Sequence, residues 1–87
     1  MISQKITVSN PSGLHLRPAG NLCNEAIKYE SRIEFLFSGG SANAKSVLSV
    51  LGACVKCGDE MELMCDGIDG QAAMEALTSA ISNGLGE

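Results

Sequence analysis

Hydrophobic and polar residues alternate in three short stretches of the chain, and a period of two is typical of strands with one buried face. In 2–8 Ile2, Ile6 and Val8 share one parity, and in 33–37 and 61–65 a large apolar side chain or a cysteine stands at every second position. A glycine pair after the second stretch offers a tight turn into a short return strand over 41–44. We therefore expect four strands, of which the middle two form a hairpin.

Between and after these strands, apolar residues recur every three or four positions, as they do on the buried face of a helix. The first such pattern covers 16–29. Ser46 can cap a short helix that ends near Gly52, since its hydroxyl can accept from the open amides of the first turn. After the last strand, Asp69 is expected to cap a final helix that Gly84 ends.

The predicted elements follow the order βαββαβα, with no linker, repeat or low-complexity tract between them. Strands in this order favour an antiparallel sheet, and amphipathic helices bury their apolar stripes against one face of it. We expect a single α+β domain over residues 1–87. Its predicted architecture is an open-faced β-sandwich, with a four-stranded antiparallel sheet and three helices on one face.

Charge and composition narrow the classes of function. Ten acidic against six basic side chains give a net charge of −4, which disfavours nucleic acid and anionic membranes as partners. No apolar run reaches the length of a membrane span, so membrane insertion is not expected. The start, "MISQKITVSN", lacks a hydrophobic signal segment. We therefore expect a cytoplasmic protein, and we expect it to be a monomer.

Four cysteines (Cys23, Cys54, Cys57 and Cys65) allow two disulfides, but a cytoplasmic location favours reduced thiols, three of them in apolar company. Cys54 and Cys57 have the CxxC spacing of zinc and redox sites. A four-ligand metal site would need two more ligands, and redox pairs of this type normally open a helix, whereas this pair precedes a turn. We expect neither a metal nor a cofactor.

The only histidine of the chain, His15, stands where a helix is predicted to begin. Pro18 supports this start, because proline is tolerated in the first turn of a helix. The first turn, formed by Leu16, Arg17 and Pro18, would direct open amides toward the imidazole, and the helix dipole favours the neutral, nucleophilic ring. Arg17 can reach an anion placed on that ring, and Gly13 leaves the approach open.

These residues together predict a nucleophilic nitrogen inside a phosphate cradle, and histidine can form a covalent intermediate. The plainer interpretation is that His15 merely ends a loop and that Arg17 is a solvated charge. The combination of His15, Arg17, Pro18 and a helix start favours the phosphate site. A catalytic triad is not expected, because the chain holds no second histidine to serve as a base. A small metal-binding domain would need a ligand pair in the first loop, which has only His15.

Several separated motifs resemble those of one family. "GLHLRPAG" resembles the active-site motif of HPr, the histidine-containing phosphocarrier of the bacterial sugar phosphotransferase system. The likeness continues through "AKSVLSVLGA", "GDEMEL" and "GIDGQAAMEAL" to the terminal "GLGE". The resemblance implies the open-faced β-sandwich fold and a phosphoryl carrier that is not itself an enzyme. His15 would accept the phosphoryl group from phosphorylated enzyme I and pass it to a histidine of an enzyme IIA domain, while Arg17 neutralises its charge.

The chain also departs from the family pattern. Leu16 stands where the family usually has a small residue, and it would alter the rim of the site. Ala53-Cys54 replaces the usual Leu-Gly, which should loosen the core after the second helix. Asn24 and Ile27 replace basic residues of many members, which should weaken electrostatic docking to acidic partners. The two residues of the phosphoryl site itself are kept.

The segment "KSVLSVL" holds more apolar residues than the buried stripe of one short helix requires, so that part of it should face outward. The resemblance implies that Val47, Leu48 and Leu51 form a patch that docks on partner proteins, beside Leu16 and Gly20. The alternative is a fully buried helix.

Ser46 matches the serine that a dedicated kinase phosphorylates in many Gram-positive members of the family, where it controls carbon catabolite repression. The resemblance thus adds a Ser46 kinase, a phosphatase and a catabolite-control transcription factor as candidate partners. Ser46 could equally be no more than a helix cap. The alternative function is an HPr-like regulatory module that binds transcription factors or enzymes rather than serving sugar transport. In that class the histidine is often replaced, whereas here it is present.

Overall fold

Four strands of the computed structural model, which describes residues 1–86, pair side by side in the order β1-β4-β2-β3. The strands are β1 (Ile2–Thr7), β2 (Arg32–Phe37), β3 (Gly40–Asn43) and β4 (Glu60–Asp66). Every pairing is antiparallel, so that neighbouring strands run in opposite directions. The expected four-stranded antiparallel sheet is confirmed. Glu87, the last residue of the "GLGE" motif and of the expected domain, lies outside the described residues.

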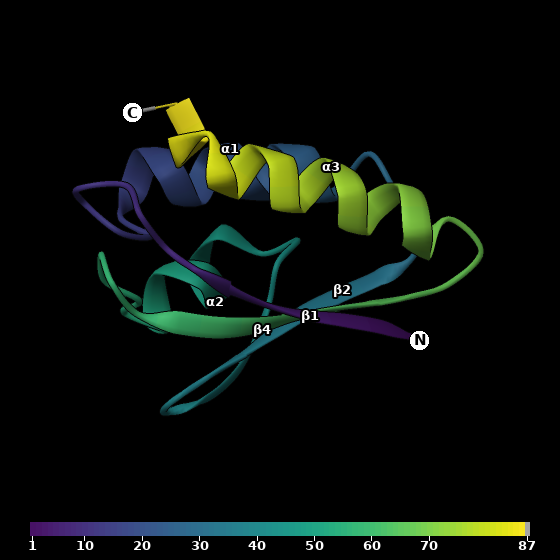
Figure 1. Ribbon diagram of the computed structural model, residues 1–87, viewed down its shortest axis with the longest axis horizontal. Helices are drawn as coiled ribbons and strands as arrows, with labels where there is room; N and C mark the ends of the chain where they lie inside the picture. Colours follow the sequence, from purple (N-terminus) through teal and green to yellow (C-terminus); the bar gives the residue numbers. More distant parts are fainter. Residues whose placement is uncertain (87) are drawn as a thin grey trace.

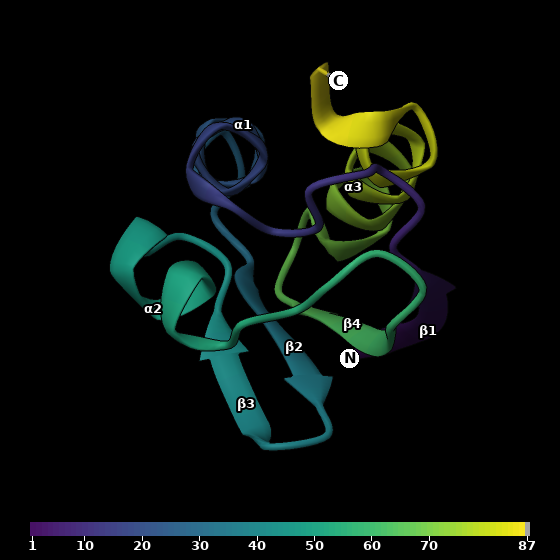
Figure 2. The same ribbon diagram turned by 90° about the vertical axis from the view of Figure 1, so that its left-hand side faces the viewer.

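The helices lie on one side of this sheet. They are α1 (Leu16–Ala26), α2 (Val47–Gly52), α3 (Gly70–Ser82) and a single 3-10 turn, η1 (Gly84–Gly86). Figure 1 shows α1 and α3 running across the sheet, and the end-on view in Figure 2 shows them next to each other above it. The short α2 lies beside α1 and β3 (Figure 2). The three-helix, open-faced arrangement is therefore confirmed.

Alternation along the strands builds the core. Met61 and Leu63 of β4 point to the helices, and their register partners Ile6 and Phe35 point the same way. The apolar stripes of α1 and α3 cover these residues, so that Leu22 of α1 and Leu77 of α3 are fully buried. Burial of one such side chain favours folding by about 1.5–3 kcal/mol. The sequence pattern thus identified both faces of the sheet correctly.

Element ends differ from the sequence expectations by one turn or less. The first helix was expected to reach residue 29 but ends at Ala26. The chain continues in tighter turns, because the amides of Lys28 and Tyr29 donate to carbonyl oxygens three residues back. The last helix ends at Ser82, two residues before the expected glycine.

The prediction that the Asp69 side chain caps the last helix is wrong. Asp69 occupies the N-cap position of α3, but its side chain makes no capping hydrogen bond there. The carboxylate instead accepts hydrogen bonds from the backbone amides of Glu30 (2.8 Å) and Ser31 (2.9 Å) and from the Ser31 hydroxyl. These hydrogen bonds lower the pKa of Asp69, and the bond from the Ser31 hydroxyl has the largest effect. Asp69 therefore ties the loop after α1 to the loop before α3.

The four cysteines are free thiols in different surroundings. Cys65 is buried on β4 as its parity predicted, and burial raises the pKa of its thiol, with a further rise from the Asp69 charge. Cys23 is half-buried, with its sulfur 3.0 Å from the Lys45 carbonyl oxygen. The expectation that three cysteines lie in apolar company is wrong, because Cys54 and Cys57 are both exposed on the loop after α2.

Candidate functional site

His15 occupies the N-cap of α1, as predicted. Its backbone is extended (φ −79°, ψ −172°), and its carbonyl oxygen accepts the Ala19 amide at 2.8 Å. The imidazole makes no capping hydrogen bond, so its nitrogens are not used to satisfy the helix end. Leu16, Arg17 and Pro18 form the first turn, and Leu16 and Arg17 are exposed. The first-turn amides and the positive end of the helix dipole thus lie beside an exposed ring.

Gly13 has a different role from the one predicted. It was expected to keep the approach to His15 open. Its φ is +64°, and a Cβ there would lie 2.5 Å from the Val55 carbonyl oxygen and 2.7 Å from the Lys56 Cα. The absence of a side chain therefore lets the loop before His15 lie directly on the segment after α2. The Leu14 amide donates to the same Val55 oxygen at 2.9 Å, which closes this contact.

Further main-chain bonds join the same two loops. The Val8 amide donates to the Asp59 carbonyl oxygen at 2.9 Å, and the Gly58 amide donates to the Val8 carbonyl oxygen at 2.7 Å. Within the first loop, the Asn10 side-chain amide donates to the Gly13 carbonyl oxygen at 2.6 Å. The position of His15 is therefore set from both sides: by α1 after it, and by the 55–59 loop before it.

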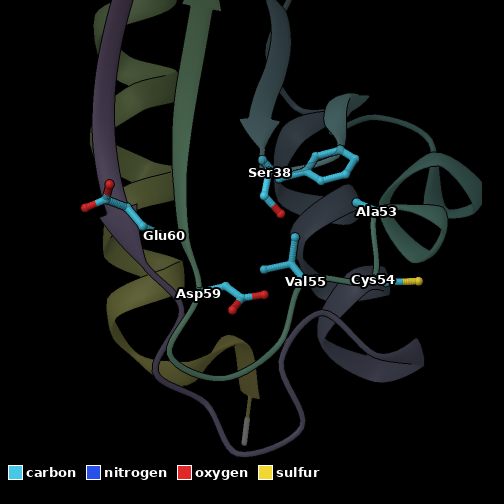
Figure 3. A pocket seen from close by; sticks show the side chains of 7 residues that line it. Ser38, Ala53, Cys54, Val55, Asp59 and Glu60 are labelled. Atoms are coloured by element: carbon cyan, nitrogen blue, oxygen red, sulfur yellow. The ribbon is translucent and has the colours of Figure 1, made fainter.

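Two hollows flank the segment after α2. The larger, of about 300 Å³, contains His15 in its wall together with Ser12, Leu14, Leu51, Cys54, Val55 and Lys56. The smaller, of about 130 Å³, is lined by Phe37, Ser38, Ala53, Cys54, Val55, Asp59 and Glu60 (Figure 3). Cys54 contributes to both and has a φ of +54°, in the left-handed region that favours glycine. The exposed cysteine at this position therefore has a glycine-like backbone.

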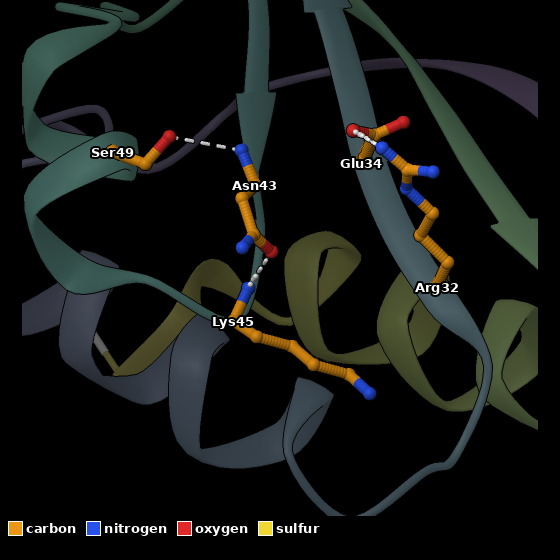
Figure 4. Close-up of polar contacts among 5 residues, drawn as sticks. All are labelled: Arg32, Glu34, Asn43, Lys45 and Ser49. Atoms are coloured by element: carbon orange, nitrogen blue, oxygen red, sulfur yellow. Dashed lines mark hydrogen bonds and ion pairs between the residues drawn. The ribbon is translucent and has the colours of Figure 1, made fainter.

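Ser46 caps α2 as predicted, because its hydroxyl oxygen accepts from the Ser49 amide at 3.3 Å. Side-chain hydrogen bonds also hold the residues next to Ser46 in place (Figure 4). The Ser49 hydroxyl accepts from the Asn43 amide, and the Asn43 side chain accepts from the Lys45 amide, both at 2.9 Å. The Lys45 ammonium donates to the Tyr29 carbonyl oxygen at 2.6 Å. The start of α2 is thus fixed to β3 and to the end of α1.

The apolar residues of α2 divide as predicted between core and surface. Val50 is fully buried, Val47 and Leu51 are partly buried against the core, and Leu48 is 78% exposed. A fully buried helix is therefore excluded for the described residues. Leu16 on α1 is 65% exposed, and α1 and α2 pack against each other. With the half-buried Gly20, the predicted docking residues lie on two adjoining helices.

Two negative findings apply to residues 1–86. No group of three or more His, Cys, Asp or Glu side chains is arranged to hold a metal ion. No helix in that range is long and apolar enough to cross a membrane. Sequence reasoning gave Lys56 no role, although it lines the hollow beside His15. Long-range contacts reveal that neighbourhood, among them the one between Gly13 and Lys56, 43 positions apart along the chain.

Fold and site together define a class of protein: a small open-faced β-sandwich that exposes one imidazole at the start of a helix. Sequence comparison supports this class, since the family described as "PTS HPr component phosphorylation site" matches residues 2–83. The chain belongs to this HPr family of phosphocarrier proteins of the phosphotransferase system.

Individual relatives agree with the family assignment. The chain is 38% identical to the phosphocarrier protein HPr of Lysinibacillus sphaericus over 82 residues, which cover 94% of this chain and 93% of that protein. A crystal structure of HPr from Thermoanaerobacter tengcongensis superposes with a TM-score of 0.95 at 32% identity, and it covers 100% of this chain and 98% of that one. A structure of Crh from Bacillus subtilis has a TM-score of 0.77 at 32% identity, with 95% of each chain covered.

Proposed function

We propose that His15 accepts a phosphoryl group on a ring nitrogen from phosphorylated enzyme I and passes it to a histidine of an enzyme IIA domain. The observation that carries this proposal is the free, exposed imidazole at the N-cap of α1. Membership of the phosphocarrier family supports it. The chain is then a protein substrate of phosphotransferases rather than an enzyme, and the transfer needs no metal or cofactor of its own.

The transfer follows from the chemistry of the ring. A neutral ring nitrogen of His15 attacks phosphorus in line with the bond to the donor histidine. The new P–N bond forms as the donor's P–N bond breaks, and the bonding electron pair returns to the donor ring. Passage to enzyme IIA is the same step with the roles exchanged. Exposure of His15 supports this two-way use, because both partners must reach the same nitrogen.

The first turn of α1 supplies the stabilisation. Negative charge on the phosphoryl oxygens is favoured beside the open amides of Leu16 and Arg17, whereas Pro18 has no N–H to contribute and fixes the turn. The Arg17 guanidinium offers a planar fork of donors for the same oxygens. These groups lower the energy of the anion without burying it, which suits a carrier that must release its cargo.

The exposed leucines on α1 and α2 are proposed as the docking surface. Leu16, Gly20, Val47, Leu48 and Leu51 lie on two adjoining helices, with Leu48 at 78% and Leu16 at 65% exposure. Apolar side chains this exposed favour contact with another protein. The same patch would meet enzyme I and the enzyme IIA domain in turn, since each must approach His15.

Ser46 is proposed as a regulatory phosphorylation site for a dedicated kinase and phosphatase. Its hydroxyl lies at the start of α2, next to Val47 and Leu48 of the docking surface. A phosphate there would repel an acidic partner while remaining compatible with the helix start. The likeness to Crh, the catabolite repression HPr of Bacillus subtilis, supports a second candidate function: a regulatory module that binds a transcription factor or an enzyme. The presence of His15 favours the carrier.

Incubation with phosphoenolpyruvate and enzyme I tests the carrier function. Intact-mass spectrometry should show the gain of one phosphoryl group, which is lost in acid and kept in alkali, as for a phosphoramidate. Ser46→Ala should gain the same group, because Ser46 is not its acceptor. A wild-type protein that gains no phosphoryl group, or one that gains an acid-stable group, would contradict the proposal.

A further inference from the structure

Basic side chains are scarce in this protein, with six Lys and Arg against ten Asp and Glu. Three of the six have partners among residues 1–86. Lys28 pairs with Glu25 at 3.2 Å, and Arg32 pairs with Glu34 at 3.4 Å (Figure 4). The Lys45 ammonium is engaged by a carbonyl oxygen at 2.6 Å. Each of these three cations therefore already has a partner within the fold.

The remaining three cations are Lys5, Arg17 and Lys56, and two of them lie beside His15. Lys5 is on β1, opposite Glu62 in register and on the face of the sheet away from the helices. Arg17 is in the first turn that follows His15, and Lys56 lines the 300 Å³ hollow that contains His15. Apart from Lys5, the unpaired cations thus gather at the proposed phosphoryl site.

The backbone of Lys56 is held in place by both loops. Its Cα would lie 2.7 Å from a Cβ on Gly13, so the two main chains are in direct contact. Its amide donates to the Asp59 carboxylate at 2.9 Å, and its carbonyl oxygen accepts the Asp59 amide at 3.0 Å. The Lys56 side chain is exposed and starts from a fixed point next to the His15 loop. A lysine side chain is long and flexible, so its ammonium can follow a moving anion.

The basic and acidic side chains near His15 line different hollows. None of the residues that line the larger hollow is acidic. The carboxylates of Asp59 and Glu60 belong to the smaller hollow on the other side of Val55. In Figure 3 the Asp59 side chain is directed toward Val55, whereas Glu60 points away from this segment. The Asp59 carboxylate is occupied by the Lys56 amide. An anion on His15 would therefore meet Lys56 without a competing carboxylate in the same hollow.

We propose that Lys56 is a second phosphoryl-binding cation of this site, which contacts the phosphoryl group on His15 during transfer together with Arg17. The inference rests on the proposed function, since it presupposes that His15 carries the group. Arg17 approaches from the helix and Lys56 from the 55–59 loop, so the two cations reach the anion from different elements. Lys56 stabilises the charge that the phosphoryl oxygens bring into the hollow.

Replacement of the charge alone tests this role. Lys56→Met keeps most of the stem, and Lys5→Met is the matched control, because it removes the same charge on the far face of the sheet. Lys56→Arg restores the charge. Two readouts are needed: the steady-state constants for phosphorylation by enzyme I, and the hydrolysis rate of the isolated phosphorylated protein. Urea unfolding of all variants verifies that they are folded.

Lys56→Met should lower kcat/KM by roughly tenfold, which corresponds to about 1.4 kcal/mol of transition-state stabilisation. It should also change the hydrolysis rate of the phosphorylated protein, while Lys5→Met leaves both values at wild type and Lys56→Arg recovers most of the loss. Equal behaviour of Lys56→Met and Lys5→Met would overturn the proposal. So would a rise in KM alone with unchanged hydrolysis, since that result assigns Lys56 to partner docking. A wild-type protein that accepts no phosphoryl group would instead refute the proposed function itself.

Discussion

Gly13 offers the sharpest test of how this fold positions its histidine. Gly13→Ala would place a Cβ 2.5 Å from the Val55 carbonyl oxygen, and that oxygen belongs to the main chain and cannot rotate away. The alanine must also adopt a φ of +64°, which costs roughly 1–2 kcal/mol in an L-residue. If the loop moves to relieve the contact, the Leu14 hydrogen bond to the same oxygen is lost, for about 1 kcal/mol more. The sum is a destabilisation of roughly 2–3 kcal/mol.

Gly20→Ala is the matched control, because a Cβ at that helical position meets nothing within 4 Å. It should stabilise the protein by about 0.5–1 kcal/mol, the usual gain from replacing glycine inside a helix. In a domain of this size 1 kcal/mol shifts Tm by about 4–8 °C, so thermal unfolding followed by circular dichroism resolves both changes. Gly13→Ala should lower Tm by roughly 10–20 °C, and phosphoryl acceptance should slow as His15 moves. Equal Tm values for Gly13→Ala and wild type would refute the reasoning.

Three further predictions concern the site and its supports. His15→Ala should abolish phosphoryl acceptance from enzyme I and Arg17→Ala should slow it roughly a hundredfold, both with wild-type circular dichroism; an acid-labile phosphate on His15→Ala would contradict this. Ser46→Asp should accept phosphate from enzyme I at least roughly tenfold more slowly, with Ser46→Ala near the wild-type rate, because only the former adds a charge beside the docking surface. Since the pKa of Asp69 is lowered in the folded protein, its contribution to stability is present above the unfolded pKa and is lost as pH falls through the folded value. Urea unfolding across the acid range should therefore show a shallower loss of stability for Asp69→Asn than for wild type; identical slopes would count against the Asp69 hydrogen bonds as its cause.

Local sequence rules predicted the parts of the fold that depend on neighbouring residues. Alternation in 61–65 identified the buried face of β4, and Pro18 correctly indicated that α1 begins just after His15. Both signals act within a few residues of the feature they predict. The Ser46 cap belongs to the same kind, because donor and acceptor are three residues apart.

Long-range contacts were beyond these rules. The sequence prediction for Gly13 was based on its neighbour His15, whereas its close contacts are with Val55 and Lys56. Asp69 was assigned to the nearest helix, yet its carboxylate bonds to Ser31, 38 positions away. A single sequence does not reveal which distant backbone will approach a given residue, so the cause of each was misassigned even where the residue itself was noted.

The two loops that meet beneath His15 are joined mainly through peptide groups: Leu14 to Val55, and Val8 to Asp59 and Gly58. Hydrogen bonds of this kind do not depend on the identity of the side chains that the same residues carry. Substitutions on the outer surface of these loops can therefore change what a partner recognises while His15 stays where it is. The choice of partner can therefore differ between related chains, because mainly the backbone sets the position of His15.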